Sequence, residues 1–139
     1  MITLDEFVTR LCRLGVDGAH RRFPRSQRDR EILMQSVVMR LDSARTYSEP
    51  EINAQLKAWS SEVAPSIDID HVTLRRLLVD YHRLERTFDG SKYRVGFPAS
   101  VVAFDLEIYD LDLRATTAAY REHVQRRRRR RNAGVPAAS

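Results

Sequence analysis

The sequence predicts a mainly α-helical protein with a small β-hairpin, arranged as a winged helix-turn-helix with extra N-terminal and C-terminal helices. One observation is the expected order of elements over 21–97, which is helix, short strand, helix, helix and hairpin. In that order two helices form the helix-turn-helix and the hairpin forms the wing. The other is the dipeptide Asp89-Gly90 between two β-prone runs, because this pair is typical of tight hairpin turns.

Residues 1–20 are expected to form a helix and a linker. Thr3 followed three residues later by Glu6 fits a capping box. Apolar residues at helical spacing then predict a helix over about 4–14: Leu4, Phe7, Leu11 and Leu14. Cys12 falls in the same apolar pattern, which predicts a buried thiol, and a single cysteine suits a reducing cytosol.

A second helix is predicted over about 27–41, with Ser26 as its cap. Its apolar residues cover nearly the whole circumference, so we expect this helix to be central: Ile32, Leu33, Met34, Val37, Val38, Met39 and Leu41. A β-prone piece at 45–47 leads into a third helix that begins with the capping box of Ser48 and Glu51. Three apolar side chains share one face of that third helix: Ile52, Leu56 and Trp59.

The fourth helix is predicted over about 70–82, with Asp70 as its cap, and it is the expected DNA-recognition helix. Its inward stripe has helical spacing: Leu74, Leu77, Leu78 and Tyr81. The β-prone runs 84–88 and 92–95 form the predicted hairpin.

Residues 98–125 are expected to extend this core. Alternating apolar and polar residues at 104–109 favour a strand, and a final helix should begin near residue 112 and continue into the arginines. The last segment, 126–139, is predicted to be an arginine-rich and largely disordered tail. No long apolar run is present near the N-terminus, so we expect a cytoplasmic protein without a membrane span.

The positive net charge comes from one segment. The formal net charge is +5, with 24 basic and 19 acidic residues, and Arg126 to Arg131 supply six of the basic groups. Without them 18 basic residues face 19 acidic ones, so the body carries −1 and has no global attraction to phosphate. A DNA-binding face on the body must therefore be local.

Short segments over about half of the chain match the pattern of a known family. They are Arg22-Phe23-Pro24, Ile32-Leu33, Tyr47-Ser48-Glu49, Glu51-Ile52-Asn53, Leu74-Arg75-Arg76-Leu77-Leu78-Val79-Asp80, Leu84, Arg86, Asp89-Gly90 and Tyr93. They resemble a bacterial family of unknown function that occurs alone or fused behind an ArsR-type repressor domain. Such proteins are usually described as transcriptional regulators, and that is what the resemblance implies. The stretch ahead of Phe23 is too short for a separate repressor domain, so this sequence departs from the fused versions.

The expected function is therefore a DNA-binding transcriptional regulator. The outward face of the fourth helix would offer guanidinium donors to guanine and apolar contact to a thymine methyl group, while the wing would contact phosphates. The candidate nucleic-acid-binding residues are Val72, Thr73, Arg75, Arg76, Arg83, Lys92, Arg94, Arg126, Arg127, Arg128, Arg129, Arg130 and Arg131. The arginine run would neutralise phosphates of DNA or RNA without selecting a sequence.

Two other hypotheses stay open. In one, the winged helix is a protein-interaction module that packs on a partner or on itself through Val72, Val79 and surplus apolar surface of the second helix. In the other, the tail leads an RNA-associated or ribosome-associated protein. A homodimer also stays open, by analogy with DNA-binding winged helices.

We expect no enzyme activity, no cofactor and no metal. His71 and His82 lie eleven residues apart on one predicted helix, which separates them by about 16 Å, too far for one ion. Asp68 and Asp70 suggest a cation site, but helix capping explains Asp70 more simply. The sequence has no glycine-rich phosphate loop and no serine elbow.

Overall fold

The computed structural model describes residues 1–17, 20–98 and 102–138. Its helices are α1 (Leu4–Gly15), α2 (Gln27–Val38), α3 (Glu49–Glu62), α4 (His71–Asp80), the 3-10 helix η1 (Leu106–Asp110) and α5 (Leu113–Ala138). Its strands are β1 (Arg21–Arg22), β2 (Tyr47–Ser48), β3 (Ile67–Asp68), β4 (Leu84–Arg86) and β5 (Lys92–Val95). The described part is thus mainly helical with small sheets, as predicted. Parts of three predicted segments lie outside the described residues, namely 18–19, 99–101 and 139.

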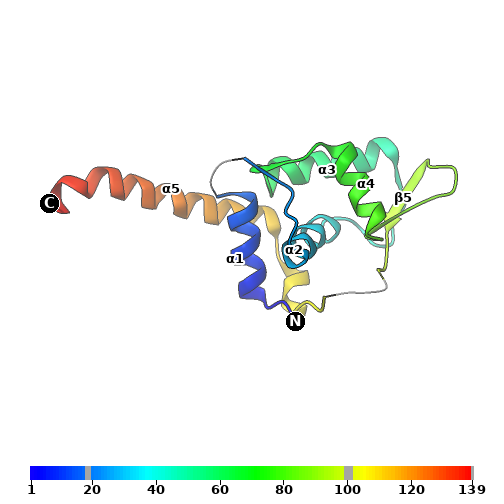
Figure 1. The fold of residues 1–139 in the computed structure, drawn as a ribbon, viewed down its shortest axis with the longest axis horizontal. Helices are drawn as coiled ribbons and strands as arrows, with labels where there is room; N and C mark the ends of the chain where they lie inside the picture. Colours follow the sequence, from blue (N-terminus) through cyan, green and yellow to red (C-terminus); the bar gives the residue numbers. More distant parts are fainter. Residues whose placement is uncertain (18–19, 99–101, 139) are drawn as a thin grey trace.

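Helix α2 lies in the middle of the body, with α1 on one side and α3, α4 and the hairpin on the other (Figure 1). Every residue from 31 to 38 is buried, the polar ones included. Ser36 satisfies its hydroxyl inside the core, since its Oγ accepts from Trp59 Nε1 at 2.9 Å and donates to the Leu33 carbonyl at 2.6 Å. The prediction of a central helix is confirmed, although α2 ends at Val38 rather than near residue 41.

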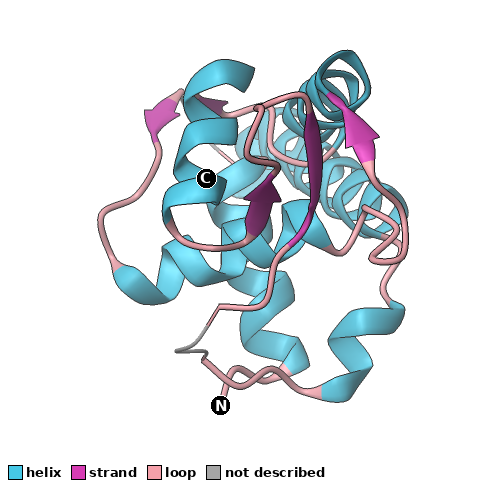
Figure 2. Cartoon of the chain, turned by 90° about the vertical axis from the view of Figure 1, so that its right-hand side faces the viewer, coloured by secondary structure: helices cyan, strands magenta, loops and turns pink. Residues whose placement is uncertain are grey.

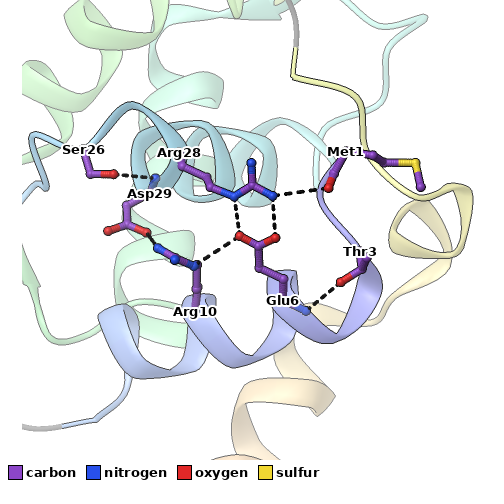
Figure 3. A network of polar contacts seen from close by, with 7 residues as sticks. All are labelled: Met1, Thr3, Glu6, Arg10, Ser26, Arg28 and Asp29. Atoms are coloured by element: carbon purple, nitrogen blue, oxygen red, sulfur yellow. Dashed lines mark hydrogen bonds and ion pairs between the residues drawn. The ribbon is translucent and has the colours of Figure 1, made fainter.

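A polar network fixes α1 against the start of α2 (Figure 3). The Arg28 guanidinium donates to both carboxylate oxygens of Glu6 and to the Met1 carbonyl, and Arg10 donates to Asp29 at 2.7 Å. The hydrogen bond from Arg28 lowers the pKa of Glu6 below its usual value. Beneath this network Cys12 is buried, as predicted, and burial raises the pKa of its thiol to about 11.

The larger sheet has the order β2-β5-β4 and is antiparallel. Tyr47 of β2 lies opposite Tyr93 of β5, and both are buried, so the short strand holds the hairpin against the body. A parallel pair, β1-β3, connects the segment before α2 with the segment before α4. The hairpin therefore forms as predicted, and β2 adds a third strand beside β5.

The predicted strand at 104–109 is wrong. Phe104 makes only an isolated parallel bridge to Ile2, and the chain then turns into η1. The reason is local, because the side chain of Asp105 accepts from the Glu107 amide at 3.2 Å and so caps a helical turn. Ile108 of η1 is buried and Phe104 packs edge-on against Phe7, with ring centroids 6.0 Å apart.

The predicted cap of α3 is a complete capping box. The Ser48 Oγ accepts from the Glu51 amide at 3.3 Å, and Glu51 Oε1 accepts from the Ser48 amide at 3.0 Å. The hydrogen bonds to Ser48, together with Arg45, lower the pKa of Glu51 from 4.5 to about 2. The charged form of Glu51 is thus the one that the fold stabilises.

We predict that Glu51→Gln lowers stability at neutral pH and that the gap to the wild type closes in acid. The folded pKa of Glu51 lies below its unfolded value, so its contribution is fully present above about pH 4.5 and is lost as the pH falls towards about 2. Urea unfolding followed by circular dichroism over that range measures the gap. Glu107→Gln is the control, because its exposed carboxylate caps no described helix. A gap that stays constant down to the lowest pH would contradict the prediction.

Candidate nucleic-acid interface

Helix α4 begins where the sequence predicts, at the cap residue Asp70. Its carboxylate accepts from the Thr73 amide at 2.7 Å and from the Thr73 hydroxyl at 2.9 Å. These hydrogen bonds lower the pKa of Asp70, so the cap carries a negative charge at the helix N-terminus, where the helix dipole favours it.

The two faces of α4 separate as predicted in the middle of the helix. Leu74 and Leu78 are fully buried, while Val72, Thr73 and Arg76 are exposed. The predicted exposure of these three site residues is confirmed. Within the described residues Arg76 takes part in no ion pair, so its guanidinium faces water, as a group that contacts DNA bases must.

Arg75 does not lie on this open face. Its side chain is 16% exposed and reaches back to α3, where Nη1 donates to Asn53 at 2.5 Å and lies 3.5 Å from a Glu49 carboxylate oxygen. The guanidinium carbon also sits 5.5 Å from the centre of the Tyr93 ring of β5. The expected base contact by Arg75 is therefore corrected, because this side chain already joins α4 to α3 and to the hairpin.

The helical pattern predicts that Tyr81 faces the core and that Arg83 is exposed, and the structure shows the reverse. Arg83 is buried at 4% exposure, and its guanidinium pairs with Glu31 and donates to Gln35 at 3.0 Å. Tyr81, placed in the inward stripe, is 39% exposed. The predictions for both residues are wrong because α4 ends at Asp80 and His82 takes a left-handed conformation, with φ at 59°.

The hairpin presents exposed cations next to α4. Lys92 and Arg94 of β5 are both exposed, as predicted, and Arg94 Nε lies 2.7 Å from a Glu85 carboxylate oxygen across the hairpin. The turn is held by Asp89, which accepts from the Thr87 hydroxyl and from Ser91, and these bonds lower its pKa to about 2.

Two further hairpin residues are absent from the predicted site, Arg86 and Phe88. Both are exposed, and Phe88 stands fully clear of the body beside the turn. Gly90 has a φ of 77°, and a side chain there would collide with the Arg86 guanidinium. Their position beside Asp89-Gly90 is the sequence signal that could have placed both at the exposed end of the hairpin.

The arginine run lies on a different part of the molecule. Arg126 to Arg131 are all exposed and belong to α5, which leaves the body and ends far from the hairpin (Figure 1). The structure thus differs from the prediction of a largely disordered tail. Two acidic groups oppose the repulsion among the guanidiniums, since Glu122 lies 2.5 Å from Arg126 and Asp17 lies 3.9 Å from Arg128.

Metal-binding groups and membrane-spanning helices are two further features that the described residues could contain. Within the described ranges no group of three or more histidine, cysteine, aspartate or glutamate side chains could hold a metal ion. No helix in the described part of the chain is long and apolar enough to cross a bilayer.

The sequence matches the family described as "Uncharacterized protein conserved in bacteria (DUF2087)" over residues 20–95, which is more than half of the chain. This region begins just before β1 and ends with β5, so it contains α2, α3, α4 and the hairpin. Comparison with curated proteins and with solved structures finds no match.

We predict that Arg83→Met lowers the free energy of unfolding by about 3–5 kcal/mol, because Glu31 would keep a buried charge without its partner. Replacing both Glu31 and Arg83 with methionine should recover most of the loss, since no charge then remains buried. Arg76→Ala, on the open face, should change stability by less than about 0.5 kcal/mol. Urea unfolding measures all three, and equal effects of Arg83→Met and Arg76→Ala would refute the assignment.

Proposed function

The chain belongs to this family of uncharacterized bacterial proteins, and from the geometry of its own residues we propose that it is a transcriptional regulator that binds double-stranded DNA through α4 and the β4–β5 hairpin. The family region and the proposed DNA-binding unit coincide, because residues 20–95 contain every element of that unit. The proposal includes the resemblance to bacterial proteins that occur alone or fused behind an ArsR-type repressor domain.

The order of elements supports a winged helix-turn-helix. Helix α2 is followed by β2, α3, α4 and the antiparallel pair β4–β5, with β2 completing the sheet beside β5. In this arrangement α4 is the recognition helix and the hairpin is the wing. The connection between α3 and α4, residues 63–70, is longer than a tight helix-turn-helix turn and contains β3.

The observation that carries the proposal is the exposed face of α4, centred on Arg76. Arg76 can donate two hydrogen bonds to O6 and N7 of a guanine, which is a common base-specific contact in the major groove. Val72, 40% exposed at the first turn, can meet a thymine methyl group, and Thr73 can reach a base or a phosphate.

The hairpin cations support the same face. Figure 2 looks onto the end of the molecule where the hairpin strands lie in front of the helices. Lys92 and Arg94 can contact phosphates there, and such contacts position a protein on the duplex without selecting a sequence. Arg75 helps indirectly, because its contacts with Asn53 and Tyr93 fix α4 relative to the hairpin. The arginine segment of α5 would add non-specific affinity for phosphate.

A protein-interaction module is the second candidate, and exposed apolar side chains favour it. Phe97 and Tyr109 are 83% and 54% exposed and line one cavity of about 420 Å³. The apolar surface first expected for this role is mostly covered, since α2 is buried from 31 to 38 and Val79 packs against the core. Light scattering that shows a strict monomer, with no protein recovered in nuclease-treated pull-downs, would reject this candidate.

We predict that Arg76→Ala weakens binding to a preferred duplex by about 1–3 kcal/mol, a factor of about 5 to 150, and weakens binding to random duplexes much less. In vitro selection from random duplexes would supply the preferred sequence, and fluorescence anisotropy would give both affinities. Removal of residues 126–139 should lower the affinity for random duplexes and flatten its salt dependence, because the arginines bind phosphate without selecting a sequence.

The matched control is Arg13→Ala, which removes the same charge from an exposed position on α1. It should reduce affinity for both duplexes slightly and equally, because only long-range electrostatics changes. Equal losses on preferred and random DNA for Arg76→Ala would count against base recognition by α4. A chain that ignores duplexes even at low ionic strength would overturn the proposed function as a whole.

A further inference from the structure

The first half of α5 is fixed to the body. Leu113 and Thr117 are buried, and the Thr117 hydroxyl lies within hydrogen-bond distance of the Glu62 carbonyl at the end of α3, at 3.1 Å, as well as of the Leu113 carbonyl in its own helix, at 2.9 Å. One turn later the Tyr120 hydroxyl donates to Asp17 at 3.1 Å. Contacts with α1, with Asp17 just after it and with the end of α3 therefore set the direction in which the rest of α5 leaves the body.

The second half of α5 carries the arginines away from the body. Arg126 follows Thr117 by nine residues, which places it about 14 Å further along the helix axis. From Arg126 to Arg131 every side chain is exposed, and six consecutive positions cover the whole circumference of a helix. This segment, which we call the arginine helix, presents guanidinium groups in all directions.

The arginine helix and the proposed DNA-binding face lie at opposite ends of the molecule. In Figure 1 the hairpin lies at one end of the long axis and the C-terminus at the other. In Figure 2 the hairpin end faces the viewer, and the C-terminus is marked within the outline of the body. A helix fixed at Thr117 and Tyr120 does not fold back, so a duplex held across the hairpin end is out of its reach.

We propose that the arginine helix binds the phosphate backbone of a second double-stranded DNA segment, so that one chain bridges two segments. This inference rests on the proposed function, because α4 and the hairpin must hold the first segment. It changes the role expected for the arginines, since their affinity for phosphate serves a different stretch of DNA from the one that α4 contacts.

The chemistry of the arginine helix favours a duplex over a single strand. Proteins that bind single strands combine basic grooves with aromatic side chains on which bases stack, and no Phe, Tyr or Trp occurs after Tyr120 in the sequence. Duplex DNA has the higher charge density, so each phosphate contact releases more counterions. The exposed pairs with Glu122 and Asp17 are weak in water and can give way to phosphate.

A two-duplex capture experiment tests the proposal. A duplex with the selected sequence is fixed to beads, the full chain is loaded at low ionic strength, and a labelled random duplex is added. Captured label is divided by the amount of protein loaded. We expect the wild type to capture the second duplex, and a variant with Arg126 to Arg131 all replaced by glutamine to capture at least about tenfold less, because six guanidiniums supply the contacts.

Replacing the same six residues with lysine is the matched control, and it should keep most of the capture because the charge is retained. Single-stranded RNA of equal length should compete less well than duplex DNA. Capture that persists in the glutamine variant would overturn the proposal, because a dimer with two α4 faces would then be the bridge. Preferential competition by RNA would overturn it in favour of an RNA partner.

The two proposals fail in different ways. If the wild type loads on the beads but captures no second duplex, bridging is refuted and the role of α4 stands. If Arg76→Ala, introduced into the glutamine variant, does not reduce loading on the selected duplex, the role of α4 is refuted whatever the arginine helix captures.

Discussion

The buried ion pair between Glu31 and Arg83 is the constraint on which the geometry of the proposed interface depends. Arg83 lies between the end of α4 and the start of β4, and Glu31 lies on the central helix. Breaking such a pair leaves one charge in the core at a cost of several kcal/mol, so the junction has one stable position. Since α4 ends and the hairpin begins at this junction, the ion pair sets the placement of both on α2.

Three arginines within nine residues consequently have three different roles. Arg83 is buried and holds the junction, while Arg75 is partly buried and joins α4 to Asn53 and to the ring of Tyr93. Of the three, only Arg76 faces water. Arg75 and Arg83 hold the helix on which it lies. A guanidinium that is to recognise a base gains from a rigid helix, because less conformational freedom is lost on binding. The buried pair and Arg75 supply that rigidity.

Local chemistry made much of this fold predictable, and the errors at the candidate site occur where local chemistry ends. Ser48, Asp70 and Asp89-Gly90 each fix a helix start or a turn through contacts within a few residues, so the sequence alone identifies them. The exchange of Tyr81 and Arg83 was not predictable from periodicity, because it depends on His82 leaving the helical conformation. The engagement of Arg75 depends on Asn53, twenty-two residues away, and spacing within one helix carries no information about such a partner.

The positively charged segment and the proposed recognition helix lie at different ends of the molecule. The arginine helix supplies six positive charges and the rest of the chain has a net charge of −1, while the hairpin end mixes Arg76, Lys92 and Arg94 with the carboxylates of Asp70 and Glu85. Under the proposed function, long-range attraction to DNA is therefore a property of one end, and discrimination between sequences has to come from short-range contacts at the other. Salt screens the first far more than the second, so ionic strength sets the balance between non-specific capture and base-specific binding.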